Sequence, residues 1–405
     1  MQTFVYKARD LKTGKKTTAE IEADNEKGAA RILSERGLAP LEIKAKDSGG
    51  IQGLLNRIPT KDRVVFSRQL STLMNAGLPL VQSLTTVKGQ TGNKPLKTVI
   101  EQVVSDVETG SNLSAAMAAH PKVFDNVYVS LIAAGETSGT LDVSLARLAD
   151  QQEKDAEVVS KIRGAMVYPI IVLLVLGGVV IFMLTTVLPQ VQTLYAGLPG
   201  AKLPLLTTAL LSLSDFILKF WWLMVFLLGG GAFLGVRWAR TQNGKSRIDR
   251  FKMTAPAIGP LFMKLYMARF ARISATLVGS GVPIIKMLTT TAEAVDNVHI
   301  EASIIRAVDQ VKGGKSLSQS LAGDKNFLDL VPNMINIGEQ SGSLDTMLAK
   351  LADYYEKEVD NQVRSISTIV EPALMVIVGI IALVLVAAVL LPIYSLAGKN
   401  IIPKY

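Results

Sequence analysis

The sequence has no cysteine and only two histidines among its 405 residues. Without cysteine the chain can form no disulfide, no thiolate metal site and no cysteine nucleophile. The cysteine count therefore does not indicate whether the protein works in an oxidising or a reducing compartment. The two histidines, His120 and His299, stand at unrelated places and receive no role. These absences remove the residue types on which many enzymes and structural metal sites depend.

Catalytic sequence patterns are missing as well. The run Gly313–Ser316 resembles the end of a phosphate-binding loop, but the position that requires the first glycine holds Asp309. No Gly-x-Ser-x-Gly and no His-Glu-x-x-His pattern occurs. We therefore expect a protein that is not an enzyme and that has no cofactor and no metal site. If it takes part in an energy-consuming process, another subunit must hydrolyse the nucleotide.

The net charge of +9 does not indicate a nucleic-acid partner. A single-strand binder interleaves basic residues with stacking aromatics, and no such run occurs. The basic residues instead cluster directly after an apolar stretch, at Arg237, Arg240, Lys245, Arg247, Arg250 and Lys252. The first thirty residues are charged and have no apolar segment, so no cleaved signal peptide is expected.

Long apolar runs predict three membrane spans. Residues 165–188 and 373–391 are each almost wholly apolar and reach the length of about 20 residues that a helix needs to cross a bilayer. Residues 216–236 form a third span, in which Lys219 lies near one end and can extend to the interface. No carboxylate, arginine or histidine lies at mid-bilayer depth, so no proton relay or ion path is expected.

The charges of the connecting segments predict the orientation. Residues 189–215 carry few charges, whereas residues 237–264 open with the basic cluster. By the positive-inside rule the amino terminus and residues 237–264 are cytoplasmic, while residues 189–215 and the tail 392–405 lie outside.

The chain repeats itself. "GETSGTLDVSLARLADQQEKD" from Gly135 returns as "GEQSGSLDTMLAKLADYYEKE" from Gly338, and 13 of the 23 positions from Ala133 to Asp155 match their counterparts from Asn336 to Glu358. The offset is 203 here and 204 earlier, where Arg68 parallels Arg272. Each copy is a soluble segment that ends in a span, and the span at 216–236 brings the chain back so that both copies face the same side. The repeats are therefore parallel.

Apolar spacing within each copy predicts helices only. The breaks at Gly77-Leu78-Pro79 and Gly281-Val282-Pro283 place glycine after one helix and proline on the first turn of the next. Roughly six helices per copy fit this pattern. We expect two antiparallel six-helix bundles, at residues 62–164 and 265–372.

The motif Gly-Glu-x-Ser-Gly-x-Leu-Asp occurs once in each copy. We expect Gly135 and Gly338 to end a helix, and Thr140 and Ser343 to cap the next one. Asp142 and Asp345 then stand in a first turn, where the helix dipole favours a negative charge. Helix capping does not explain Glu136 and Glu339, which could hold a loop, bind a cation or meet a basic residue of a partner. The second glycine of the motif in each copy, Gly139 and Gly342, completes this candidate site.

Residues 1–45 differ in kind from the rest. Two alternating segments joined by Lys12-Thr13-Gly14 predict a β-hairpin, followed by a short helix and a returning strand. This small α+β module is either a partner-docking appendage or a cap on the first bundle. Residues 46–61 form a linker.

Taken together, these residues resemble the PilC/GspF family of inner-membrane platform proteins, which serve type IV pilus assembly and type II secretion. The resemblance rests on the amino-terminal "YKARD" hairpin, the doubled "AGLPL" and "GExSG" segments and the three spans, and it covers essentially the whole chain.

The resemblance implies a multi-pass inner-membrane protein that forms a homo-oligomer and contacts a hexameric assembly ATPase, pilin or pseudopilin subunits, and other inner-membrane alignment proteins of the machine. It implies that residues 154–166 and 357–372 act as levers. Pro169 and Pro372 would then be pivots at the membrane boundary, although ordinary helix entry explains them equally well. Type II secretion is the alternative to a pilus role. A permease subunit is a remote alternative, disfavoured by the parallel repeats and the absence of intramembrane charge.

Overall fold

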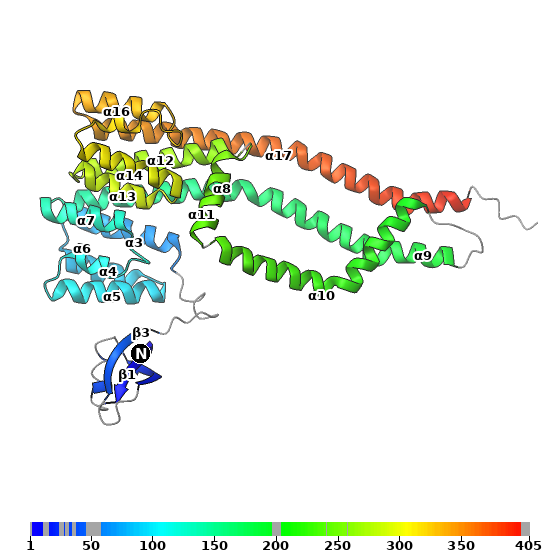
Figure 1. Ribbon diagram of the computed structural model, residues 1–405, viewed down its shortest axis with the longest axis horizontal. Coiled ribbons are helices and arrows are strands. Elements are labelled where there is room, and N and C mark those ends of the chain that lie inside the picture. Colours follow the sequence, from blue (N-terminus) through cyan, green and yellow to red (C-terminus); the bar gives the residue numbers. More distant parts are fainter. Residues whose placement is uncertain are drawn as a thin grey trace, which may run out of the picture. The chain divides into compact units, whose positions relative to one another are not determined.

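A computed structural model describes residues 2–10, 16–23, 28, 32–34, 38–45, 58–196, 204–239, 241–256 and 258–397 (Figure 1). The chain divides into two compact units. The first comprises Met1–Asp62 and Thr91–Val99, and the second comprises Arg63–Gln90 and Ile100–Tyr405. The predicted hairpin turn, most of the predicted linker and the end of the tail lie outside the described residues.

The amino-terminal module contains a three-stranded antiparallel sheet in the order β2-β1-β3. Its strands are β1 (Gln2–Asp10), β2 (Lys16–Ala23) and β3 (Leu38–Ala45). Strand β1 pairs with β2 from Gln2↔Ala23 to Arg9↔Lys16, which is the register of a hairpin. The described residues 28 and 32–34 between β2 and β3 are helical. The elements expected from the alternating sequence are therefore present.

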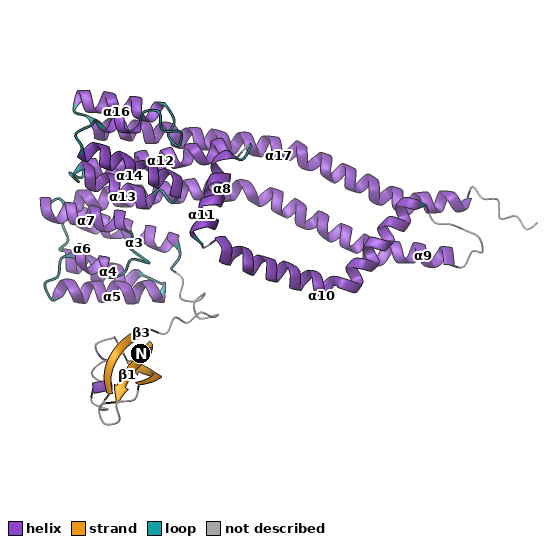
Figure 2. Cartoon of the chain, in the orientation of Figure 1, coloured by secondary structure: helices purple, strands orange, loops and turns teal. Residues whose placement is uncertain are grey.

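Each copy of the repeat contains six helices within the described ranges 58–196 and 258–397 (Figure 2). Copy 1 has α3 (Thr60–Asn75), α4 (Leu80–Gln90), α5 (Lys94–Glu108), α6 (Leu113–Ala118), α7 (Asn126–Ser138) and α8 (Leu141–Phe182). Copy 2 has α12 (Gly259–Gly279), α13 (Ile284–Ala294), α14 (Val298–Lys312), α15 (Leu317–Leu321), α16 (Leu330–Ser341) and α17 (Leu344–Ala397). The predicted mainly helical, duplicated fold is confirmed.

The breaks between the first two helices of each copy follow one geometry. Gly77 and Gly281 have φ of +83° and +80°, a conformation that glycine adopts without strain. In copy 1 the Gly77 N–H donates to Met74 O and the Leu78 N–H to Leu73 O, which is a Schellman ending. Pro79 and Pro283 stand directly before α4 and α13 rather than on their first turns, so that detail of the prediction is wrong by one residue.

Aromatic side chains mark equivalent core positions in the two bundles. Phe66 of α3 lies 5.9 Å from Phe124 between ring centroids, and its counterpart Phe270 of α12 lies 5.1 Å from Phe327. All four side chains are buried. Burying a Phe or Leu side chain contributes roughly 1.5–3 kcal/mol, so these pairs hold the first helix of each copy against the loop before α7 or α16.

The last helix of each copy continues far beyond its bundle. Helix α8 has 42 residues and α17 has 54, so they extend about 63 Å and about 80 Å, well beyond the hydrocarbon core of about 30 Å. After α8 the chain passes through a π-helical turn, η1 (Met183–Val187), into α9 (Leu188–Ala196). The described residues contain three helices long and apolar enough to cross a membrane, in the regions where spans were expected.

The middle span belongs to α10 (Leu205–Ala239), which bends at Phe220, where the backbone leaves helical geometry. The arm before the bend packs against the other two spanning helices. Leu211 forms a buried cluster with Leu184, Leu188 and Ala388, Thr207 Oγ1 donates to Ala388 O at 2.9 Å, and Ser214 Oγ donates to Leu184 O at 2.5 Å. Much of the segment 189–215, expected as an external loop, is therefore helical in α9 and the first arm of α10.

The segment 237–264, expected as a connector, is also largely helical. It contains α11 (Gln242–Thr254) and the beginning of α12. Helix α12 begins at Gly259, whereas α3 begins at Thr60, the counterpart of Lys264. In this extension Leu261 packs with Val359 and Val363 of α17, and Val158 and Ile162 of α8 border the same cluster. The start of α12 thus contacts both long helices where they leave the bundles.

Candidate functional site

The doubled motif forms the same sharp turn in both copies. Gly139 and Gly342, with φ of +72° and +68°, end α7 and α16 in the left-handed conformation. Thr140 N–H donates to Gly135 O at 2.9 Å, and Ser343 N–H donates to Gly338 O at 3.0 Å. The chain then reverses direction into α8 and α17.

Gly135 and Gly338 do not end their helices, and that prediction is wrong. Both lie inside α7 and α16 and are buried, one turn before the helix ends. A Cβ atom on Gly135 would lie 2.6 Å from Ser144 Oγ, and one on Gly338 would lie 2.9 Å from Leu344 Cα. Glycine is needed here because the helix before the turn touches the helix after it, not because of a left-handed backbone.

Glu136 and Glu339 each hold the start of the short helix in their own bundle. The Glu136 carboxylate accepts the Leu113 N–H at 2.5 Å, the Ser114 N–H at 3.2 Å and the Ser114 hydroxyl. Glu339 accepts the Leu317 N–H at 2.6 Å, the Ser318 N–H at 3.2 Å and the Ser318 hydroxyl at 2.5 Å. The first N–H groups of a helix have no partner within it, so each carboxylate supplies a cap from another helix.

Asp142 and Asp345 stand in the first turns of α8 and α17 and are exposed. Thr140 occupies the N-cap position of α8, but its side chain makes no capping hydrogen bond to that helix. Its hydroxyl lies 2.7 Å from Ser138 Oγ, and Ser343 pairs with Ser341 at the same distance. The expected side-chain cap at Thr140 is therefore absent. The Thr140 hydroxyl instead pairs with the Ser138 hydroxyl across the turn.

Arginine clamps join the first and last helix of each copy. Arg68 of α3 binds both oxygens of Glu153 at 2.6 Å and Asp150 at 2.5 Å. Arg272 of α12 binds Glu356 at 2.8 Å and Asp353 at 2.5 Å. Hydrogen bonds to Glu153 and Asp150 raise the pKa of Arg68 above its ordinary value. Bidentate pairs of this kind fix orientation as well as distance.

Sequence reasoning missed these clamps, because each joins two helices that lie more than 80 residues apart in the chain. The signal was present in the repeat itself. Arg68 and Arg272 are paired at an offset of 204, and their acidic partners are paired at 203. Opposite charges that recur in both copies are candidates for such a pair.

The two long helices are joined to each other beyond the bundles. Lys161 of α8 binds Asp360 of α17 at 2.5 Å and Glu157 of its own helix at 2.9 Å. Lys264 of α12 binds Glu358 of α17 at 2.8 Å. The two proposed pivots, Pro169 and Pro372, lie inside α8 and α17, within uninterrupted helix.

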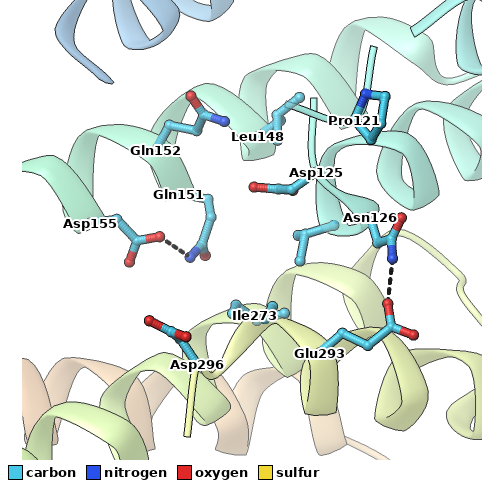
Figure 3. A pocket seen from close by; sticks show the side chains of 12 residues that line it. Pro121, Asp125, Asn126, Leu148, Gln151, Gln152, Asp155, Ile273, Glu293 and Asp296 are labelled. Atoms are coloured by element: carbon cyan, nitrogen blue, oxygen red, sulfur yellow. Dashed lines mark hydrogen bonds between the residues drawn. The ribbon is translucent and has the colours of Figure 1, made fainter. Parts of the chain in front are cut away.

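A cavity of about 420 Å³ lies between the two bundles (Figure 3). Gln151 and Asp155 of α8 face Ile273 and Asp296 of copy 2 across it, and Gln151 Nε2 donates to Asp155 at 3.2 Å. Asn126 donates to Glu293 at its rim. Among the described residues no group of three or more His, Cys, Asp or Glu side chains could hold a metal ion.

Fold and contacts define a class of protein: a duplicated, multi-pass membrane protein whose helical bundles continue directly into spanning helices. Two family models match the chain. "Type II secretion system (T2SS), protein F" covers residues 66–189 and 270–392, and "Type II secretion system protein F, N-terminal domain" covers residues 1–44.

Curated relatives match over nearly their full length. The type IV pilus assembly protein PilC of Thermus thermophilus is 40% identical and that of Myxococcus xanthus 36%, over 98% of this chain and 99% and 95% of the relatives. The type II secretion system protein F of Pseudomonas aeruginosa is 33% identical over 98% and 99%. The chain therefore belongs to the type II secretion system protein F family, which includes the PilC proteins.

Family membership confirms several predictions. The chain is a platform protein of type IV pilus assembly or type II secretion, and the platform proteins of this family are not enzymes. It is a multi-pass membrane protein with three candidate spans.

Proposed function

We propose that this protein is the inner-membrane assembly platform of a type IV pilus machine. It couples a hexameric cytoplasmic ATPase to the extraction and polymerisation of pilin subunits. The observation that carries the proposal is the continuity of α8 and α17, each of which is one helix from the bundle turn into the span. A displacement of either bundle is thereby transmitted to the bilayer.

Three sets of contacts support a mechanical role. The glutamate caps fix the short helices, the arginine clamps fix the base of each long helix, and Lys161 joins the two long helices to each other. Bidentate clamps hold direction as well as distance, so each bundle and its long helix move as one body. The loading surface for the ATPase then lies on the bundles, and the pilin contacts lie along the spans.

The basic segment after α10 supports a cytoplasmic location for both bundles, with the carboxyl-terminal tail outside. Exposed Arg247 and Arg250 lie on α11, next to the end of the middle span. The choice of pilus over secretion rests on the relatives, because the PilC proteins quoted above are 36–40% identical and the secretion protein 33%. A secretion platform that handles pseudopilins is the second candidate.

The first test is to capture the tagged chain from gently solubilised membranes and to identify what accompanies it. An assembly ATPase together with type IV pilins is the expected result. Pseudopilins in place of pilins would transfer the protein to type II secretion. Recovery of a solute-binding protein instead of an ATPase would overturn the platform role.

The lever itself is tested by interrupting α17 between its bundle and its span. Insertion of three glycines after Arg364 breaks the helix, since glycine costs about 1 kcal/mol per residue in a helix interior relative to alanine. We expect surface filaments to be lost while the ATPase still co-purifies. The same insertion at residue 50, in the predicted linker, is the matched control and should leave filaments intact. Normal filament numbers with the α17 insertion would contradict transmission through this helix.

A further inference from the structure

The two bundles of one chain pack through different faces. Within the bundles copy 1 uses α7 and α8, and copy 2 uses α12 and α13, while α8 also runs along α17 of copy 2. Ser130 Oγ lies 3.4 Å from Thr290 Oγ1, Thr276 Oγ1 donates to Gln151 at 3.3 Å, and Arg147 donates to Ser280 Oγ at 3.2 Å. Because the copies are repeats, this contact is heterologous, that is, it joins two different surfaces of the repeated bundle. The surface formed by the last two helices of copy 1 meets the surface formed by the first two helices of copy 2.

Such a contact leaves two surfaces without a partner among the described residues. They are the surface of the last two helices in copy 2 and the surface of the first two helices in copy 1. In Figure 1 α16 lies at one edge of the stacked helices of the second unit, and α4 lies toward the other. We call the first surface the α16/α17 face, which comprises Leu330, Asn333, Ile337, Lys350 and Tyr354. We call the second the α3/α4 face, which comprises Val65, Thr72, Ala76 and Thr86.

Exposure shows that the α16/α17 face is the uncovered counterpart of the packed one. Leu330 is 36% exposed and its counterpart Val127 only 6%, while Tyr354 is 48% exposed and its counterpart Gln151 only 4%. Ile337, at 50%, stands where copy 1 has the partly buried Ala134. The uncovered face therefore carries larger apolar side chains than the covered face it repeats.

The α3/α4 face shows the same relation. Thr72 is exposed where Thr276 is partly buried, and Ala76 is exposed where Ser280 is partly buried. Val65 is 45% exposed at the position of Arg269. Superimposing the internal contact would set Tyr354 against Thr72 and Asn333 against Thr86. Neither pair brings like charges together, and both can form hydrogen bonds.

Membrane geometry permits the repetition. Helices α8 and α17 leave their bundles and cross the bilayer in the same direction. The rotation that superimposes copy 1 on copy 2 therefore leaves the direction of the membrane normal unchanged. Applying it once more places the first bundle of a second chain beside copy 2, with its own spans in the same bilayer. An inverted repeat would not allow this.

We propose that the α16/α17 face of one chain binds the α3/α4 face of a second copy of the same chain. The platform then grows as a row in which copy 1 and copy 2 alternate. The row forms a ring when the rotation from one chain to the next adds up to a full turn. This inference names a surface for the homo-oligomer that the family resemblance implies. The contact is argued from the repeat and not from what the machine assembles.

Cysteine crosslinking tests the contact, because the chain contains no cysteine of its own. The pair T86C and N333C reports the contact between chains, and its internal counterpart S130C and T290C is the matched control. We expect T86C/N333C membranes to give covalent dimers and larger species on oxidation. The control should give only an intrachain disulfide. Co-expressed T86C and N333C single variants should yield dimers, and either variant alone should yield none.

Absence of interchain crosslinks from T86C/N333C, with the control disulfide formed, would overturn the proposal. Equal crosslinking by either single variant alone would show a symmetric contact and overturn it too. Adding Tyr354→Asp should lower the crosslink yield at least tenfold, whereas Ile305→Asp, 40% exposed on α14 outside this face, should not change it. The assay uses the chain without ATPase or pilin, so its failure is distinct from failure of the pilus role.

Discussion

The two copies keep the same contacts around the turn and differ in what surrounds them. Both have the left-handed glycine, the buried glycine, the glutamate cap and the arginine clamp. In the core, copy 1 has Tyr128 and Ser67, whose hydroxyls lie 3.2 Å apart, where copy 2 has Val331 and Ala271. The turn is thus retained as a unit while the core was free to exchange a polar pair for an apolar one.

The spans differ more than the bundles. The stretch from Pro169 to Pro189 is as long as that from Pro372 to Pro392, yet the first contains a π-helical turn and the second is continuous helix. The π turn places Leu184 O against Ser214 of α10. The first arm of α10, which belongs to neither copy, therefore packs on a deformed helix on one side and on a regular helix on the other.

The largest expected effect comes from removing the glutamate caps. Glu136→Ala and Glu339→Ala each take away a carboxylate that accepts two backbone N–H groups. Each hydrogen bond to a charged group contributes about 1.5–3 kcal/mol, and each variant loses more than one. We expect the amides of Leu113 and Ser114 in one variant, and of Leu317 and Ser318 in the other, to exchange hydrogen at least about tenfold faster.

The control for this prediction lies in the same motif. Asp142→Ala removes only a charge near a helix start, which is worth about 0.3–1 kcal/mol, and it should leave exchange at Leu113 unchanged. Unchanged exchange in both glutamate variants, together with weaker partner binding, would show that these carboxylates serve recognition instead of the fold.

Loss of the clamp arginine should destabilise the protein more in copy 2 than in copy 1. The Arg272 side chain is 17% exposed and its partner Glu356 16%, against 37% and 43% for Arg68 and Glu153. Arg272→Ala should lower the free energy of unfolding by about 2–3 kcal/mol because it leaves a largely buried carboxylate without its partner. Arg68→Ala should cost about 0.2–1 kcal/mol. Denaturation of the purified chain in detergent measures both, and equal losses would contradict the burial argument.

The smallest expected effect is on how the free energy of unfolding depends on pH. Burial lowers the pKa of His120, so between that folded-state pKa and the ordinary value of 6.5 the unfolded chain binds more protons. The contribution of His120 is present above this window, and the free energy of unfolding should fall as pH decreases through it. His120→Asn should flatten this dependence.

Copy 2 has Asp324 in the corresponding loop, and its titration should affect stability at a lower pH. Burial acts to raise the pKa of Asp324, but the Asn326 N–H and Arg306 bind its carboxylate, and the pKa is lowered below 3.8. Its contribution is present above 3.8 and is lost as pH falls through the lowered folded value. An Asp324→Asn variant that retained the slope between pH 5 and 6.5 would separate the two loops. Thermal unfolding of each variant against pH checks this.

Much of this fold could be predicted from the sequence. The apolar runs fix the spans through the thickness of the bilayer, and the repeat fixes the number of bundles. Gly77 and Gly281 mark helix ends because the left-handed conformation strongly favours glycine. Each of these inferences needs only neighbouring residues or a count along the chain.

The remaining features depend on contacts between distant segments. The roles of Glu136 and Gly135 become visible only when α6 and α8 are placed beside α7. No local sequence pattern marks the bend at Phe220 or the π turn. The helices in residues 189–215 were missed because weak charge indicated the side of the membrane but not the secondary structure.

The joining of two bundles in one chain changes what their contact must supply. The segment that contains α10 and α11 holds copy 2 near copy 1, so the contact between the copies forms within one chain. Polar pairs such as Arg147 with Ser280 form part of the contact there. Two separate chains have no such tether, so the same geometry between chains needs more intrinsic affinity. Leu330, Ile337 and Tyr354, in place of Val127, Ala134 and Gln151, provide the larger apolar surface that an untethered pair requires.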